Sequence, residues 1–166
     1  MPRHRTTSLT PPLQERLSQR HLARRLGAVL PLVTLDAAGF PHPMAVSYLE
    51  LKAYDASTVG LVIQATSGSA RNLASRDVAT LIIVEPDGVF YVKLRRVDGP
   101  LEVLGGEALG LGYFLLEVVE VLEDAPADWE AGMRITQGAM YAPVPKLDDP
   151  WARLTLAAVA APRARA

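Results

Sequence analysis

Six apolar runs of strand length, bounded by glycine, proline, aspartate or serine, constrain the fold of this 166-residue chain more than any other feature. Short apolar runs between turn-forming residues are typical of β-strands, and none of these runs has the length of a membrane span. A flat antiparallel sheet of six strands would leave two open edges, and closure into a small barrel removes them. We therefore predict a fold that is mainly β with flanking helices, a six-stranded antiparallel Greek-key barrel. Its strands are expected at residues 28–35, 41–51, 58–65, 78–85, 89–103 and 112–122.

The length favours one domain over residues 1–166, with the barrel at 28–122. Residues 1–9 and 161–166 are expected to be a flexible arm and tail. Leucine spacing predicts an N-terminal helix over 10–26. Helix start and stop signals predict a short helix over 70–76 and C-terminal helices within 124–160, the first from 124–128 to about 141 and the last with Pro150 at its start. The first three strands read as a meander, and a bulge is expected near Gly99 in the long fifth strand.

Prolines and apolar residues indicate which strands lie at an edge of the sheet and which face contacts a neighbour. Pro31 and Pro43 each lack a ladder donor and are expected beside an edge or a bulge. The sixth strand is apolar on both faces apart from Glu117 and Glu120, which predicts that its outer face meets a second copy of the chain.

Composition excludes several classes of function. The chain contains no cysteine, which removes disulfides, thiol nucleophiles and thiolate metal sites, and its three histidines lack carboxylates at ligand spacing, so we expect no metal site. A net charge of −1 argues against a general nucleic-acid binder. Residues 1–26 hold six arginines and one acid, and residues 97–133 hold nine acids and no lysine or arginine, so the two segments are expected to face each other. With neither a secretory signal nor a membrane segment in evidence, a cytoplasmic location is the default expectation.

The residues that point to chemistry lie where the third predicted strand runs into the short helix. Thr66, Ser67 and Ser69 supply hydroxyls around Gly68, and a helix that begins there directs free amides and its positive dipole end at the same spot. An anion such as a phosphate monoester would be stabilised there. Two neighbours, Arg71 and Asn72, add a positive charge and a neutral donor. The alternative is an ordinary capping serine followed by a solvated arginine.

Over residues 29–121 the chain resembles the FMN-binding split-barrel proteins related to pyridoxamine 5′-phosphate oxidase. The resemblance lies in the turn and strand Asp36-Ala37-Ala38-Gly39-Phe40-Pro41-His42, in the junction with Asn72-Leu73 and Arg76-Asp77, and in Tyr91-Val92-Lys93-Leu94 followed by Gly99. It implies a split β-barrel that forms a homodimer, with FMN or another small ligand in the cleft between the subunits.

The resemblance also implies which residues would hold FMN. The backbone around Val46 and Ser47 would lie near the ring, and Ala65, Thr66 and Ser67 near the ring and the phosphate. Where the family has Ser-Arg-Lys, this chain reads Ser67-Gly68-Ser69, so the two phosphate-binding cations are replaced by glycine and serine. Arg71 could substitute for them from one turn further on, and Lys93 or Arg95 could reach across from the fifth strand.

Two hypotheses of function follow. The first is an FMN-dependent oxidoreductase, in which the flavin carries the electrons and few catalytic side chains are needed. The second is a split-barrel protein that has lost FMN and binds another small ligand in the dimer cleft. No catalytic residue can be assigned from the sequence, and the substrate is not specified by it.

Overall fold

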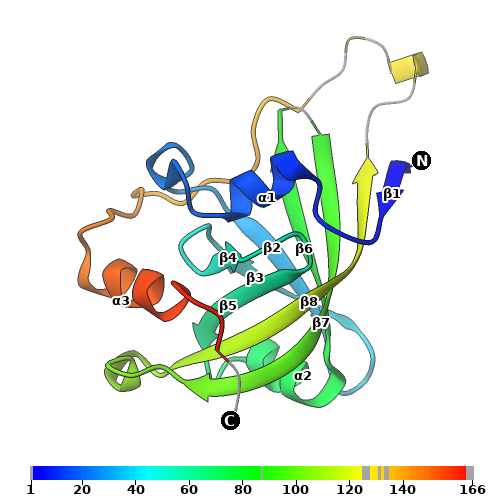
Figure 1. Ribbon diagram of the computed structural model, residues 1–166. Helices are drawn as coiled ribbons and strands as arrows, with labels where there is room; N and C mark the ends of the chain where they lie inside the picture. Colours follow the sequence, from blue (N-terminus) through cyan, green and yellow to red (C-terminus); the bar gives the residue numbers. More distant parts are fainter. Residues whose placement is uncertain (1, 87, 125–127, 131, 133–134, 164–166) are drawn as a thin grey trace.

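The computed structural model describes residues 2–86, 88–124, 128–130, 132 and 135–163. In this part of the chain, eight strands form one sheet (Figure 1). They are β1 (Pro2–Thr6), β2 (Leu30–Leu35), β3 (Pro41–Val46), β4 (Leu51–Ala53), β5 (Thr58–Gln64), β6 (Val78–Glu85), β7 (Gly88–Glu102) and β8 (Leu111–Asp124). The α-helices are α1 (Pro11–Leu17), α2 (Gly68–Arg76) and α3 (Pro150–Ala158), and short 3-10 turns occupy Leu22–Arg24, Glu107–Leu109 and Asp128–Glu130.

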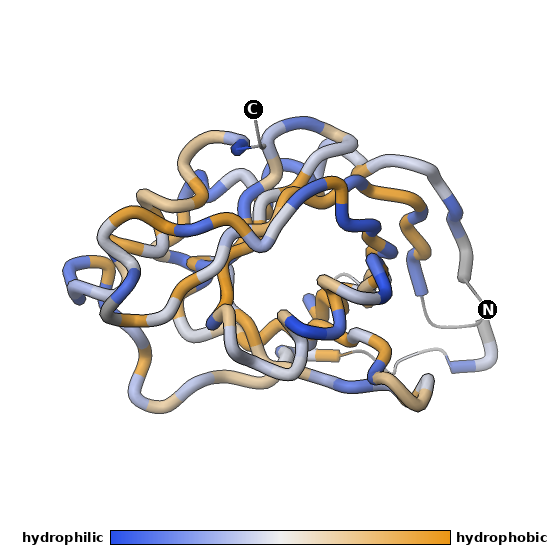
Figure 2. The backbone as a smooth tube through the Cα atoms, turned by 90° about the horizontal axis from the view of Figure 1, so that it is seen from below, coloured by the Kyte–Doolittle hydropathy of each residue, from blue (hydrophilic) through white to orange (hydrophobic). Residues whose placement is uncertain are grey.

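The sheet curls because its two ends are close in the sequence. The strand order is β3-β2-β6-β7-β8-β5-β4, all pairs are antiparallel, and β1 pairs with β8. The terminal strands β3 and β4 are joined by residues 47–50 alone, so the two edges of the sheet must approach each other. Figure 2 shows the backbone bending round into a ring. Apolar side chains fill the inside, among them Leu32, Leu61, Leu81 and Phe114, which are essentially inaccessible to solvent.

Two details of the predicted sheet are wrong. The sheet has eight strands rather than six, because β1 is an additional strand and the predicted strand 41–51 is two strands, β3 and β4. A turn separates them, in which one carboxylate oxygen of Glu50 accepts hydrogen bonds from the Ser47 amide (2.6 Å) and hydroxyl (2.9 Å). Because β3 and β4 lie at opposite ends of the strand order, the first strands do not form a meander.

The prolines of the hairpin β2–β3 lie only at positions where the backbone N–H is not needed for hydrogen bonds between these two strands. The Asp36 N–H donates to the Phe40 carbonyl, so the hydrogen-bonded pairs alternate from there and include Thr34/His42. Pro31, Pro41 and Pro43 fall at the intervening positions. On the free edge of β3, two of the three outward positions are prolines, which leaves this edge few donors with which to pair another strand.

The predicted bulge in the fifth strand is present in β7. The register with β8 shifts between Arg96 and Asp98 and again between Asp98 and Leu101. Gly99 lies at φ +107°, and a Cβ there would sit 2.5 Å from the Tyr113 carbonyl oxygen. Only glycine fits this close approach of the two strands without strain.

The N-terminal segment is more ordered than the predicted arm. β1 pairs with β8 antiparallel, and Arg5 forms an ion pair with Glu120, so the expected contact between basic and acidic segments is confirmed at this pair. The predicted helix 10–26 is wrong in length, since α1 ends at Leu17 and Gln19 and His21 take positive φ angles. The Gln19 amide donates to the carbonyls of three residues around β4, which turns the chain away from the helix axis.

The C-terminal half of the prediction also changes. β8 continues to Asp124, and residues 135–149 contain no helix, so the predicted helix from 124 to about 141 is absent from the described part of this segment; residues 125–127, 131 and 133–134 lie outside it. The last helix, α3, begins at Pro150 as predicted. It covers the first half of β8 and part of β5 with a second small core, Val62, Val103, Tyr113, Ala158 and Val159. The apolar outer face of this part of β8 is therefore buried within the same chain.

Candidate functional site

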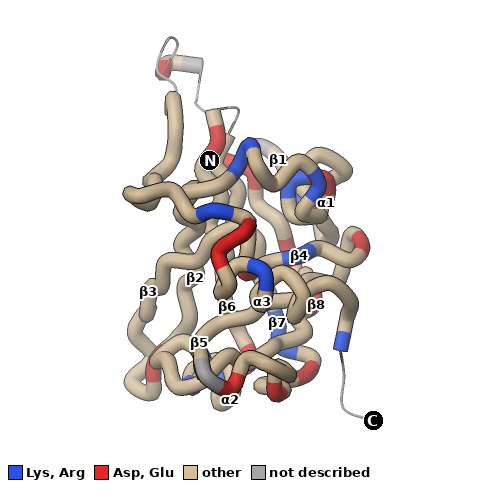
Figure 3. The backbone as a smooth tube through the Cα atoms, turned by 90° about the vertical axis from the view of Figure 1, so that its left-hand side faces the viewer, with Lys and Arg blue, Asp and Glu red and all other residues tan. Residues whose placement is uncertain are grey.

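α2 begins where the sequence predicted, at the end of β5. Ser67 takes extended backbone angles, and its hydroxyl accepts a hydrogen bond from the Ala70 N–H at 3.1 Å, as in a standard N-cap. The helix ends at Asp77 in the left-handed region. α1 and α2 lie at opposite ends of the curled sheet (Figures 1 and 3), so the N-terminus of α2 is far from α1.

The N-terminus of α2 offers donors without acceptors. Within the described residues, the N–H groups of Gly68 and Ser69 have no hydrogen-bond partner. The Ser69 hydroxyl is buried, and it too lacks a partner there. The positive end of the helix dipole adds to these donors, so a negatively charged group is favoured at this place.

Arg71 turns back toward this junction. Its guanidinium donates to the Thr66 carbonyl, although the side chain is exposed and lies one turn into the helix. The cation is therefore beside the Thr66 carbonyl at the start of the helix. Asn72 behaves differently, because its amide donates to the Thr34 hydroxyl at 3.0 Å and so fastens α2 to β2.

His42 is the residue of this junction that sequence reasoning missed. It lies on β3, and a Cβ at Gly68 would stand 2.7 Å from its Nε2 atom. The imidazole therefore packs over the first residue of α2. The sequence holds one indirect signal, because a glycine at position 68 leaves room for a neighbouring side chain.

The other predicted residues lie elsewhere. Lys93 pairs with Glu120 across β7 and β8, nine residues along β8 from Leu111, which is about 30 Å at strand spacing. Leu111 is the residue opposite Gln64 at the end of β5, so Lys93 does not reach the junction. Arg95 pairs with Glu117 at 3.2 Å.

Val46 and Ser47 lie at the far end of β3 from His42, four residues or about 13 Å away. Both are buried, and Ser47 is hydrogen-bonded to Glu50. Burial raises the pKa of the Glu50 carboxyl above its ordinary value, and the two Ser47 donors oppose part of that rise. Between the two ends, β3 and its neighbour β2 contain no charged residue, so the edge of the sheet is uncharged (Figure 3).

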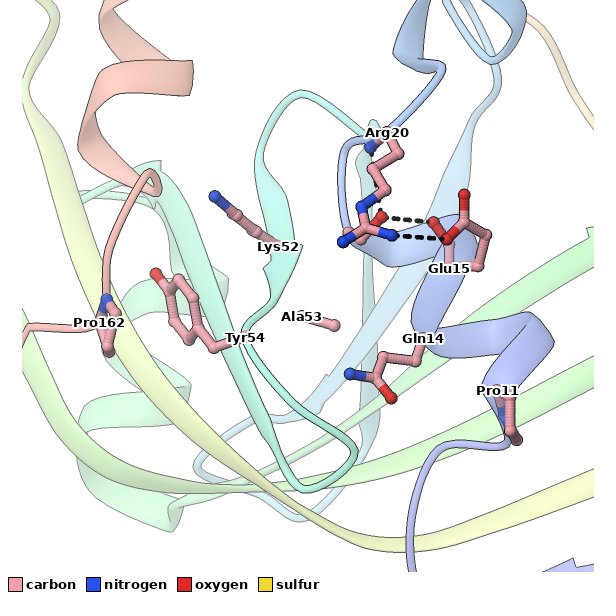
Figure 4. A pocket seen from close by; sticks show the side chains of 9 residues that line it. Pro11, Gln14, Glu15, Arg20, Lys52, Ala53, Tyr54 and Pro162 are labelled. Carbon is pink, nitrogen blue, oxygen red and sulfur yellow. Dashed lines mark hydrogen bonds and ion pairs between the residues drawn. The ribbon is translucent and has the colours of Figure 1, made fainter.

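A larger cleft of about 600 Å³ lies between α1, β4 and the C-terminal segment (Figure 4). Its charged groups are largely engaged with their surroundings. Arg20 lies 3.6 Å from Glu15, the Lys52 ammonium donates to the Ala160 carbonyl, and the Tyr54 hydroxyl donates to the Val159 and Ala161 carbonyls. These contacts attach the C-terminal segment to β4.

In the described residues, no group of three or more histidine or acidic side chains could hold a metal ion. The described helices also include none whose length and hydropathy would suit a bilayer crossing.

Comparison with solved structures decides the fold. A candidate pyridoxamine 5′-phosphate oxidase from Lactobacillus delbrueckii superposes with a TM-score of 0.55 at 16% identity, over 73% of this chain and 98% of the other. An FMN-binding protein from Syntrophomonas wolfei superposes with a TM-score of 0.52 at 11% identity, over 69% and 87%. A candidate flavin reductase with a split barrel domain from Shewanella frigidimarina gives 0.50 at 14% identity, over 73% and 86%.

The chain has the split-barrel fold. The resemblance inferred from the sequence is thereby confirmed at the level of architecture. No model of a known protein family and no curated relative matches the sequence.

The junction between β5 and α2 has the types of hydrogen-bond donor that the phosphate of FMN requires. Its donor set comprises the Gly68 and Ser69 amides and the buried Ser69 hydroxyl, which have no partner among the described residues, and the Arg71 guanidinium, and donors of these kinds suit an anion. The space over Gly68 that a Cβ would fill is already occupied by the His42 ring.

Proposed function

We propose that this protein is a cytoplasmic, FMN-binding, homodimeric oxidoreductase of the pyridoxamine 5′-phosphate oxidase-like split-barrel class. The observation that carries the proposal is the N-terminus of α2, where open amides and the guanidinium of Arg71 converge at the place where the family binds the FMN phosphate. When bound, FMN would supply the electron transfer, while the protein supplies position and electrostatics.

The residues that would hold FMN come from two elements. Thr66, Ser67, Ser69 and Arg71 would hold the phosphate at one end, with Ala65 beside them. By resemblance, the backbone at Val46 and Ser47 would border the ring at the other end of β3. The uncharged edge between them suits an aromatic ring system, since it presents no charge that would have to be desolvated.

A homodimer is supported by an apolar hollow of about 390 Å³ on the outside of the sheet. Val33, Leu35, Val78 and Val119 line it, and the last two are more than a third exposed. Lys93 and Arg95 border it, with Glu120 and Glu117 as their partners. An apolar centre with a paired charged rim is the usual anatomy of a subunit interface.

Purified protein tests the proposal directly. We expect a yellow solution with the visible absorption band of oxidised flavin, or quenching of FMN fluorescence when FMN is added, together with a dimer mass by light scattering. A reduced nicotinamide cofactor should bleach the flavin band if the protein is a reductase. A colourless monomer that ignores added FMN contradicts the proposal.

A second candidate is a split-barrel protein that has lost FMN and binds another small ligand in the dimer cleft. It is favoured by the replacement of two family cations with Gly68 and Ser69 and by the engagement of Lys93 with Glu120. A dimer that ignores FMN but is stabilised against heat by another small anion would support this candidate.

A further inference from the structure

The inference concerns His42, which lies against the first residue of α2 although it belongs to β3. A Cβ built on Gly68 would lie 2.7 Å from Nε2, 3.0 Å from Cε1 and 3.6 Å from Cδ2 of the His42 ring. The imidazole therefore approaches the helix edge-first, with Nε2 foremost. This places a potential N–H donor beside the two open amides of Gly68 and Ser69.

The ring is carried by a braced part of the sheet. His42 occupies a hydrogen-bonded position opposite Thr34, the Thr34 hydroxyl donates to the His42 carbonyl at 3.3 Å, and the Asn72 amide donates to the same hydroxyl. This chain of bonds fixes β3 against α2. The side chain is half-buried, so its rotamer freedom is already restricted before any ligand arrives.

The nitrogen atoms of the ring remain available. In the described residues, neither ring nitrogen has a hydrogen-bond partner and no carboxylate pairs with the ring. The charged groups of the neighbouring elements are engaged with backbone: Arg71 with the Thr66 carbonyl, Arg76 with the Ala37 carbonyl, and Asp36 with the Ala38 and Phe40 amides. Nothing else on these elements competes for the ring.

We propose that His42 is a phosphate-binding residue of the flavin site, which replaces from β3 one of the two cations that the helix has lost. This inference rests on the function proposed above. A ring N–H of an imidazole can donate a hydrogen bond to a phosphate oxygen. Gly68 then has a specific role, because a side chain there would displace the ring.

The test compares FMN with riboflavin, which has the same ring system but no phosphate. Dissociation constants are measured by fluorescence quenching for the wild type, His42→Ala, His42→Gln and Gly68→Ala, with His4→Ala on the distant strand β1 as the matched control. We expect His42→Ala to weaken FMN binding about tenfold to a hundredfold, the range of one charge-assisted hydrogen bond, and to leave riboflavin binding unchanged. His42→Gln, which keeps a donor, should lose less, and His4→Ala should lose nothing.

A double-mutant cycle isolates the contact between the two residues. Gly68→Ala alone should weaken FMN by pushing the imidazole aside, and it should have little further effect in the His42→Ala background. Circular dichroism of each variant establishes that it is folded before its affinity is used.

The outcomes separate the two proposals. If the wild type binds FMN and His42→Ala binds it equally well, or loses FMN and riboflavin to the same extent, the role of His42 is wrong and the flavin function stands. If the folded wild type binds neither compound, the flavin function fails and the role of His42 fails with it.

Discussion

Arg96 fastens α2 to the sheet, and its removal tests how the site is held in place. Its guanidinium donates to the Leu73 carbonyl at 3.0 Å, to the Gly99 carbonyl at 2.8 Å, and through Nε to the Asp77 carboxylate at 2.8 Å. One side chain thus joins the last turn of α2, its capping residue and the bulge of β7. The side chain is only 24% exposed, so water cannot readily take over these bonds.

The cost of Arg96→Ala can be estimated from these contacts. Each charge-assisted hydrogen bond contributes about 1.5 to 3 kcal/mol, but the bonds share one group and do not add. Removing one partner of a largely buried pair typically costs about 3 to 5 kcal/mol. Asp77 is half exposed and can recover some hydration, so we expect a loss of about 3 kcal/mol in the free energy of unfolding. For a domain of this size that lowers the melting temperature by roughly 6 to 12 °C.

Urea unfolding and calorimetry of Arg96→Ala, Arg96→Lys and Arg95→Ala provide the measurement. Arg95 is the adjacent residue, points to the other face and forms an exposed pair with Glu117, so Arg95→Ala should cost less than about 1 kcal/mol. Arg96→Lys should recover only part of the loss, since an ammonium cannot reach three acceptors at once. Equal losses for Arg95→Ala and Arg96→Ala would refute the reasoning.

Three further predictions concern single contacts. Arg71→Ala should weaken FMN binding about tenfold or more while leaving the melting temperature unchanged, and an unchanged FMN affinity would remove Arg71 from the site. Gly99→Ala should lower stability by about 2 to 4 kcal/mol in urea unfolding, because of the contact with β8 and the positive φ; a loss under about 0.5 kcal/mol would contradict this. Lys93 first and then Arg5 hold the pKa of Glu120 below its ordinary value of 4.5, against the opposing effect of burial. The stability from this group is therefore present above pH 4.5 and lost as pH falls below it, so Glu120→Gln should flatten the acid limb of a pH–melting curve, and an unaltered limb would exclude it.

Sequence analysis correctly predicted the parts of this fold that depend on residues close together in the chain. β6 was placed at its observed bounds, the turn into α2 was located through its capping serine, and the bulge was located through Gly99. In each case the residues within a few positions supply the reason: alternating apolar side chains, a hydroxyl acceptor, or an angle that favours glycine.

The errors come from interactions between distant segments. The polar N-terminal residues gave no periodic signal, and they form β1 because the edge of β8 is available to pair with them. The predicted strand 41–51 is divided by a turn in which the Glu50 carboxylate accepts a hydrogen bond from the Ser47 amide. A single acidic residue within an apolar run is not enough to predict such a turn. The helix expected from Asp124 to Asp128 onward rested on acidic residues that could open it, whereas pairing with β7 extends β8 to Asp124 and Asp128–Glu130 is a 3-10 turn.

The candidate site divides in the same way. Ser67 and Arg71 lie within one helical turn of each other, so the sequence could bring them together. Lys93 could be placed only through the strand register, which sets it opposite Glu120 and away from α2 of the same chain. His42 needed the packing of α2 against β3, which no spacing in the sequence encodes.

The proposed phosphate site would draw on two elements, α2 and β3. Most basic side chains near the helix already have partners: Arg76 binds the Ala37 carbonyl and Arg96 binds Asp77 and two carbonyls. Arg71 donates to the Thr66 carbonyl and so lies at the helix N-terminus itself, and the His42 ring lies against Gly68 from β3. Their separation depends on how closely the strand and the helix pack, and the bond from Asn72 to Thr34 sets that spacing. In the proposed site Asn72 would therefore be a positioning residue, because its hydrogen bond to Thr34 holds α2 against the sheet.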